Sequence, residues 1–261
     1  MRTSFVAALA NQKAVLGALI LRDMRTRFGR TAIGFVIAVA WPLTHLLAML
    51  GIWVAIGRAV PLGTNNVVFF GTGIMPYILC LYPGRMMMLA IQQNKPMLLF
   101  PVVKVIDIIL ARALLEMITA MCVLLAFCTI LYIAGVDFLP NQPAIAIAAI
   151  ALTVLYGISV GLLSCVILVL FPMWVAIFIL IMIAQWITSG ALYLPSMMPH
   201  WVLEYIVYNP LYHCISWLRT AYYDGYGGST VDPMYVVQVS LFTLLLGFAA
   251  ERAVRGKLLM K

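Results

Sequence analysis

Charged side chains are scarce in this sequence. Only 9% of its 261 residues are Asp, Glu, Lys or Arg, and 65% are hydrophobic, whereas a soluble domain has about 25% charged residues. A soluble fold this apolar would lack the polar side chains that cover a surface exposed to water. The composition therefore excludes a soluble enzyme and a disordered protein, and it leaves a polytopic membrane protein.

Motifs for catalysis and metal binding are also missing. The sequence contains no GxxxxGK[ST] phosphate-binding loop, no HExxH and no GxSxG, so we expect no catalytic residue, no metal site and no ATP site in this chain. Energy for any transport must then come from another subunit. The cysteines form no CxxC or Cys/His cluster and are predicted to be small buried apolar residues. They are Cys80, Cys122, Cys128, Cys165 and Cys214.

Long intervals without charge divide the chain into predicted membrane spans. The 27 residues between Arg30 and Arg58 would extend about 40 Å as a helix, which is enough to cross the roughly 30 Å hydrocarbon core of a bilayer. The 66 uncharged residues between Asp137 and Glu204 fit two spans, with a break at Phe171-Pro172. We therefore predict an all-α fold with six transmembrane helices. They lie at about residues 33–56, 67–82, 113–134, 144–170, 173–194 and 235–250.

The basic residues are distributed unevenly over this topology. The chain has 16 Lys and Arg against 8 Asp and Glu, which gives a net charge of +8. If the N-terminus is cytoplasmic, every basic residue except Arg58 and Arg219 lies in a segment on the inside. Because cytoplasmic segments are enriched in Lys and Arg, both termini are predicted to be cytoplasmic. The net charge then reflects orientation in the membrane and not nucleic-acid binding.

Residues 4–30, before the first span, are predicted to form an amphipathic helix in the cytoplasmic membrane interface. Apolar residues such as Leu16, Leu19 and Ile20 recur at helical spacing beside basic residues. Such a helix buries its apolar face among acyl chains and keeps its basic face near lipid phosphates. A simple positive-inside anchor is the alternative, and it is compatible with the same helix. The candidate phosphate ligands are Arg22, Arg25, Arg27 and Arg30.

The predicted inner loop, residues 85–112, contains a short apolar run between Pro96 and Pro101. The run is too short to cross a membrane. An apolar segment exposed to the cytosol needs a partner protein or a lipid surface to cover it. The alternative is an interfacial or re-entrant helix without a partner.

The predicted outer segment, residues 195–230, is aromatic and interrupted by prolines. Asn209-Pro210 is expected to separate two short helices, at about 199–208 and 211–223, that dip into the outer leaflet. Broken backbone at membrane depth is tolerated only against protein or a water-filled cavity, so this re-entrant segment should line a cavity. Its aromatic residues are either an interfacial belt or surfaces on which sugar rings stack.

Several stretches of the sequence resemble ABC-2-type polysaccharide-export permeases, and most closely those of capsule exporters. The resemblance covers nearly the whole chain. One departure is Trp41, where a Glu or Gln is expected before Pro42. The stretches that carry the resemblance are Leu21–Arg30, Ile33–Phe35, Pro42, His45–Leu47, Pro101–Asp107, Ala111–Glu116, Asn209–His213 and Gly225-Tyr226.

The resemblance implies a single ABC-2-type transmembrane domain over residues 1–261, in the bacterial inner membrane. Such permeases pair as a homodimer with two separate ATPase subunits, which bind ATP and magnesium, so no cofactor is expected in this chain. The cargo is a capsular polysaccharide, commonly acidic and carried on a lipid anchor, which passes on to periplasmic and outer-membrane export components. The loop 85–112 would supply the coupling helix that enters a cleft of the ATPase. The implied coupling residues are Pro96, Leu98, Leu99, Phe100, Pro101 and Lys104.

Candidate contacts with the exported chain lie near the predicted inner mouth and around the outer segment. Arg85 and Arg112 would attract an anionic polymer or a lipid phosphate, or else only anchor the membrane interface. The aromatic candidates for sugar contact are Tyr82, Trp186, Tyr193, Tyr208, Tyr212 and Trp217.

Two other functions remain open at this stage. One is an ABC-2 permease for another cargo, such as O-antigen, lipid or a drug. The other is a membrane-embedded enzyme that acts on lipid-linked sugars, which would need clustered carboxylates or histidines at the membrane surface. Only Asp107 and Glu116 come close to such a cluster.

Overall fold

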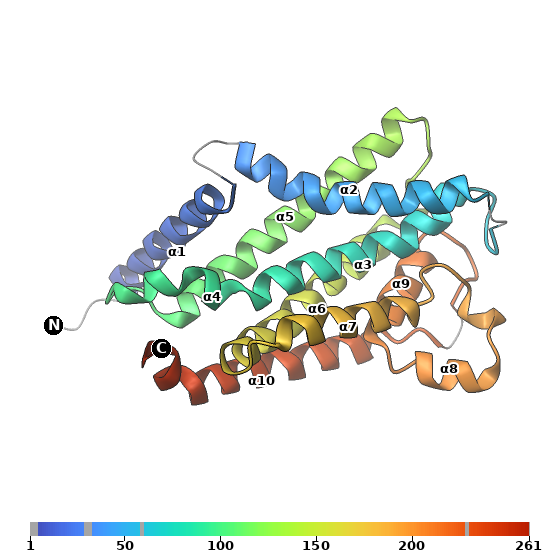
Figure 1. The fold of residues 1–261 in the computed structure, drawn as a ribbon. Helices are drawn as coiled ribbons and strands as arrows, with labels where there is room; N and C mark the ends of the chain where they lie inside the picture. Colours follow the sequence, from blue (N-terminus) through green and yellow to red (C-terminus); the bar gives the residue numbers. More distant parts are fainter. Residues whose placement is uncertain (1–4, 29–32, 58–59, 228–229, 261) are drawn as a thin grey trace.

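The computed structural model is a bundle of helices (Figure 1). It describes residues 5–28, 33–57, 60–227 and 230–260, and the side chains of 9–25, 34–57, 60–227 and 230–256. The long helices are α1 (Phe5–Phe28), α2 (Ile33–Ala55), α3 (Asn66–Met88), α5 (Val105–Ile133), α6 (Pro143–Leu170) and α10 (Pro233–Met260). The shorter elements are α4 (Ala90–Asn94), α7 (Trp174–Ile187), α8 (His200–Ile206), α9 (Pro210–Thr220) and the 3₁₀ turns η1 (Lys95–Leu99) and η2 (Pro195–Met197). The prediction of an all-α fold is confirmed.

Within the described part of the chain, five helices are long and apolar enough to cross a membrane, namely α2, α3, α5, α6 and α10. The predicted fifth span, 173–194, corresponds to the 14-residue helix α7. At about 1.5 Å per residue this helix is about 21 Å long, which is shorter than a bilayer core. The residues after Ile187 form turns and the η2 element.

The bundle has two distinct ends (Figure 1). One end, which we call the basic end, holds α1, α4, η1 and the C-terminal part of α10, so both ends of the described chain lie there. The other, which we call the aromatic end, holds α8 and α9. The basic side chains follow this division, because Arg22 of α1, Lys95 of η1 and Arg252 of α10 all belong to the elements of the basic end.

Helices α3 and α6 form the centre of the core. About 78% of the α3 span and 72% of the α6 span are buried, compared with 17% for α2 and α10. The glycines of α6 allow this packing because a side chain would not fit there. A Cβ added at Gly157 would lie 2.5 Å from the Cys80 carbonyl oxygen, and a Cβ added at Gly161 would lie 2.5 Å from the Gly84 carbonyl oxygen. The Gly157-xxx-Gly161 pattern therefore brings the α6 backbone directly against α3.

Local sequence determines where several helices begin. The Asn65 side chain accepts a hydrogen bond from the Val67 N–H at 2.9 Å and caps α3. Asp107 accepts one from the Lys104 N–H at 3.0 Å in the first turn of α5. Asn209 caps α9 through the Leu211 N–H at 3.0 Å, with Pro210 as the first helical residue. The two short helices of the outer segment are thus separated at Asn209-Pro210, as predicted.

Candidate functional site

The predicted coupling segment is an exposed turn between α4 and α5. Its 3₁₀ turn η1 is followed by extended backbone at Phe100, whose N–H donates to the Met97 carbonyl at 3.1 Å. Leu99 is 84% exposed and Phe100 is 56% exposed. Pro96, Pro101 and Lys104 are exposed as well, and Leu98 is half-buried. Adjacent large apolar side chains exposed on a turn are typical of a surface that another molecule covers.

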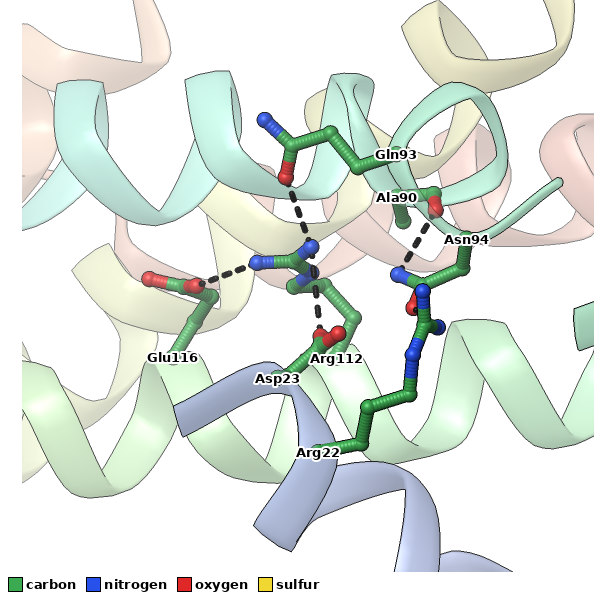
Figure 2. Close-up of polar contacts among 7 residues, drawn as sticks. All are labelled: Arg22, Asp23, Ala90, Gln93, Asn94, Arg112 and Glu116. Carbon is green, nitrogen blue, oxygen red and sulfur yellow. Dashed lines mark hydrogen bonds and ion pairs between the residues drawn. The ribbon is translucent and has the colours of Figure 1, made fainter. Parts of the chain in front are cut away.

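A buried arginine lies directly behind this turn (Figure 2). The Arg112 guanidinium of α5 is 3.2 Å from the carboxylate of Asp23 on α1 and 3.6 Å from that of Glu116, one turn further along α5. It also donates to the side-chain oxygen of Gln93 on α4 at 2.8 Å. The side chains of Arg112, Asp23 and Glu116 are 1%, 8% and 3% exposed. These four residues, the Arg112 cluster, join three helices around one cation.

Helix α1 also contacts the residues on either side of the coupling turn. Arg22 donates to the Asn94 side-chain oxygen at 2.8 Å, and the Asn94 amide donates to the Ala90 carbonyl at 3.0 Å within α4 (Figure 2). Gln12 donates to the Asp107 carboxylate at 3.4 Å. Since Asn94 immediately precedes η1 and Asp107 lies in the first turn of α5, α1 is hydrogen-bonded to both flanks of the turn.

These contacts show where the predicted phosphate ligands lie. The side chain of Arg22 reaches Asn94, and Arg25 is exposed. The side chains of Arg27 and Arg30 lie outside the described residues. The apolar residue Leu19 is buried in the protein core, so part of the apolar face of α1 packs on protein and not on acyl chains.

A cavity of about 260 Å³ opens beside the Arg112 cluster. It is lined by Ala38, Trp41 and Pro42 of α2, by Tyr82, Arg85 and Met86 of α3, and by Glu116 and Thr119 of α5. Glu116 thus faces both the cavity and Arg112. Trp41, the residue that departs from the family pattern, is 67% exposed.

A hydrogen bond orients Tyr82 in this cavity. The Tyr82 hydroxyl lies 3.1 Å from Nδ1 of His45, and the two rings meet edge to face with centroids 5.9 Å apart.

The two predicted arginines have different environments. Arg85 is exposed and lines the cavity, and it forms no ion pair with another described residue. Arg112 is buried and lies against two carboxylates. Of these two arginines, Arg85 is therefore the one that a solute can reach in this conformation.

The aromatic candidates also differ in exposure. Tyr212 is buried and donates from its hydroxyl to Thr230 at 3.0 Å, and Tyr193 donates to the Ile187 carbonyl at 3.0 Å. Trp186 packs on Tyr77 with ring centroids 5.6 Å apart, and Trp217 packs against the core. Tyr208 is 72% exposed.

Two exposed aromatic residues were missed by the sequence reasoning. Trp201 is 67% exposed and Tyr205 is 74% exposed. Together with Tyr208 they follow the i, i+4, i+7 spacing of one helical face, which is the signal that could have identified them. The face of α8 and its C-terminal turn thus form an exposed aromatic surface at this end of the bundle.

A second buried arginine organises the aromatic end. Arg219 of α9 is fully buried and donates to the Gly190 carbonyl at 2.7 Å and to the Ala191 carbonyl at 2.8 Å. Its guanidinium carbon also lies 4.2 Å from the centre of the Phe69 ring, a cation–π geometry. Burial lowers the pKa of Arg219. The sequence reasoning treated this residue only as a charge outside the membrane.

His213 holds the helices of the outer segment together. Its Nε2 lies 2.8 Å from the Val207 carbonyl oxygen after α8, and its Nδ1 accepts from the Asp232 N–H, just before α10, at 3.1 Å. The neutral Nε2–H tautomer satisfies both contacts. Burial lowers the pKa of His213, which agrees with a neutral ring.

Among the residues that the structure describes, no three His, Cys, Asp or Glu side chains converge as metal ligands would. Cys80, Cys165 and Cys214 are buried free thiols, as predicted, whereas Cys122 and Cys128 are only partly buried.

Comparisons with known proteins agree on one family. The sequence profile of the ABC-2 type transporters matches residues 15–223. The chain is 29% identical over 241 residues to the polysialic acid transport protein KpsM of Escherichia coli, covering 92% of this chain and 93% of the relative. It is 29% identical over 249 residues to the capsule polysaccharide export inner-membrane protein CtrC of Neisseria meningitidis serogroup B, covering 95% and 94%. It is 27% identical over 251 residues to the corresponding protein BexB of Haemophilus influenzae, covering 94% and 93%.

Proposed function

Since the chain belongs to the ABC-2 type transporter family, we propose that it is the membrane permease of an ATP-driven exporter of capsular polysaccharide. The relatives that match over most of their length are named as a polysialic acid transport protein and as capsule polysaccharide export inner-membrane proteins. In this proposal a homodimer of the chain binds two ATPase subunits that supply ATP and magnesium. Periplasmic and outer-membrane components receive the polymer.

One observation carries the proposal, namely the exposed apolar turn at η1 and its connections to the helices behind it. Leu99 and Phe100 offer an apolar surface to a cleft of the ATPase. A force applied there reaches α4 and α5 directly along the chain, and it reaches α1 through the Arg112 cluster. Because a buried cation held by several helices resists separation of those helices, we expect α1, α4 and the start of α5 to move as one unit.

The two ends of the bundle support one orientation in the membrane. We place the basic end, with both termini and η1, on the cytoplasmic side, because Lys and Arg are enriched there. The aromatic end then faces the periplasm. The broken helices α8 and α9 would lie in the outer leaflet near the exit of the polymer.

The entry side of the polymer path is assigned to the cavity beside Arg85. An exposed guanidinium suits the carboxylates of an acidic polysaccharide. The rings of Tyr82 and Trp41 lie in the same cavity and offer apolar faces to sugar rings. At the other end, the exposed Tyr208 is the predicted contact that a polymer can reach.

The structure disfavours the alternative of a membrane-embedded enzyme. Such an enzyme would need reactive carboxylates, yet Asp107 and Glu116 are 5% and 2% exposed. Asp107 caps the first turn of α5, and Glu116 lies against Arg112. Both carboxylates therefore have structural partners.

Co-purification with the ATPase tests the proposal. The tagged chain should retain the ATPase from the same gene cluster, and it should hydrolyse no ATP without that subunit. Leu99→Asp with Phe100→Asp should abolish the complex, because charges replace the apolar surface. Met197→Asp is the matched control, since Met197 is 67% exposed on the 3₁₀ turn η2. Full retention of the ATPase by the double variant would refute the coupling role.

A further inference from the structure

An apolar groove runs between α5 and α6 on the surface of the bundle. Two adjoining cavities form it, of about 430 Å³ and 410 Å³, and they share Leu124, Leu125, Ile147 and Ile150 in their walls. The groove therefore continues from the aromatic end of the two helices toward the middle of the bundle. Neither the coupling turn nor the cavity beside Arg85 contributes to it.

The side chains of the groove explain its depth. Ala120 of α5 and Ala146 of α6 line its floor and are 5% and 4% exposed. Larger side chains stand at its edges, such as Leu125, which is 59% exposed, and Ile147, which is 67% exposed. Small residues on the floor and large ones at the edges create a trough that the protein itself does not fill.

The groove is long enough to hold one acyl chain. On α6 it extends from Pro143 to Ile158, which is about 22 Å of helix at about 1.5 Å per residue. One leaflet contributes about half of the roughly 30 Å hydrocarbon core. The acyl chain of a lipid in that leaflet can therefore lie along the groove.

The mouth of the groove carries a negative charge. Asp137 lines it and is exposed, and it makes no ion pair with another described residue. The other exposed carboxylates of this end, Glu204, Asp224 and Asp232, add to the same negative field, while Arg219 is fully buried. A ligand at the mouth should therefore carry a positively charged group.

We propose that this groove binds one acyl chain of an amine-headed phospholipid, with the ammonium group beside Asp137. The apolar trough accepts the chain, and the carboxylate selects the head group. The proposal concerns a resident lipid of the leaflet at the aromatic end and is independent of the transported cargo. A lipid held there would fill the space between α5 and α6 and support their outer ends.

Native mass spectrometry of the full chain tests the site. The detergent-purified protein is mixed with equal amounts of phosphatidylethanolamine and phosphatidylglycerol, and the retained lipids are counted. The wild type should retain phosphatidylethanolamine preferentially. Ala151→Trp, which fills the groove from its α6 wall, should reduce retention several-fold. The matched control Ala249→Trp, at an exposed position of α10, should leave retention unchanged.

The head group is tested separately. Asp137→Asn should reduce the preference for phosphatidylethanolamine by up to about fivefold, the upper range for an exposed ion pair, whereas Asp224→Asn should not. Photo-crosslinking with a phosphatidylethanolamine that carries a diazirine on its acyl chain should label residues 117–158. Equal retention by Ala151→Trp and the wild type would overturn the proposal, as would equal binding of the two lipids by the wild type. A disulfide between two copies carrying Ile147→Cys, formed in the native membrane, would identify the groove as a dimer contact and would also overturn it.

Discussion

Removing the cation of the Arg112 cluster should strongly destabilise the basic end. In Arg112→Met the carboxylates of Asp23 and Glu116 stay buried but lose the guanidinium that lies 3.2 and 3.6 Å away. Breaking a buried ion pair by removing one partner costs about 3–5 kcal/mol. For a chain of this size, that loss corresponds to a fall in Tm of roughly 6–20 °C. The triple variant that also carries Asp23→Asn and Glu116→Gln should recover most of the loss, because it buries no charge.

The assay is thermal unfolding of the detergent-purified protein, followed by size-exclusion chromatography with fluorescence detection. His200→Ala serves as the control, because it removes an ion pair whose side chains are 88% and 64% exposed and should leave the Tm unchanged. If Arg112→Met unfolded at the wild-type temperature, or if the triple variant were no more stable than Arg112→Met, the cluster would not hold these helices together.

Three further predictions concern the core and the aromatic end. Gly161→Ala should cost about 1–3 kcal/mol of stability through overpacking against α3. Gly51→Ala should cost no stability, because a Cβ added there meets no atom within 4 Å. Equal Tm values for the two variants would contradict the close contact between α6 and α3. Arg219→Met should leave the buried carbonyls after α7 unsatisfied, which costs about 1–3 kcal/mol of stability for each carbonyl. Limited proteolysis of this variant should then cleave near residue 190. An uncleaved variant would show that Arg219 does not hold the segment after α7 in place. Burial lowers the pKa of His213 below 6.5, so the folded state binds this proton less well than the unfolded state, and stability should be complete above pH 6.5 and fall below it. His213→Gln should flatten the pH dependence of the Tm. An unchanged pH profile would assign that dependence to other groups.

The long helices could be predicted because the membrane imposes strong constraints on the sequence. Charge-free intervals and hydropathy identify α2, α3, α5, α6 and α10, since a charge at the bilayer centre is costly. These signals limit where a span can lie, but they do not show where its helix ends.

Helix α7 illustrates that limit. Its uncharged interval continues beyond residue 194, but the helix ends at Ile187. Gly190 then adopts a positive φ of 74°, and the Gly190 and Ala191 carbonyls accept hydrogen bonds from Arg219. That interaction joins positions far apart in the chain, so no local pattern reveals it.

The residues of the candidate site also differ in whether a local pattern or a contact between distant positions determines their structure. The exposed turn at Leu99 and Phe100 follows from two prolines around an apolar run, which is a local pattern. The burial of Arg112 depends on Asp23 in a different helix, so the sequence alone could not distinguish a buried structural cation from one at the mouth of a channel. Trp201 and Tyr205 were recognisable from helical spacing on α8.

In the proposed function, this chain moves a finished polysaccharide across the inner membrane. The direct measurement is to delete its gene in the encapsulated host and to locate the capsular polymer by labelling intact and permeabilised cells. The polymer should still be made but accumulate inside, and the wild-type gene should restore the surface polymer while the Leu99→Asp, Phe100→Asp variant should not. Normal surface polymer in the deletion strain, or the absence of any polymer inside it, would show that this chain is not the exporter.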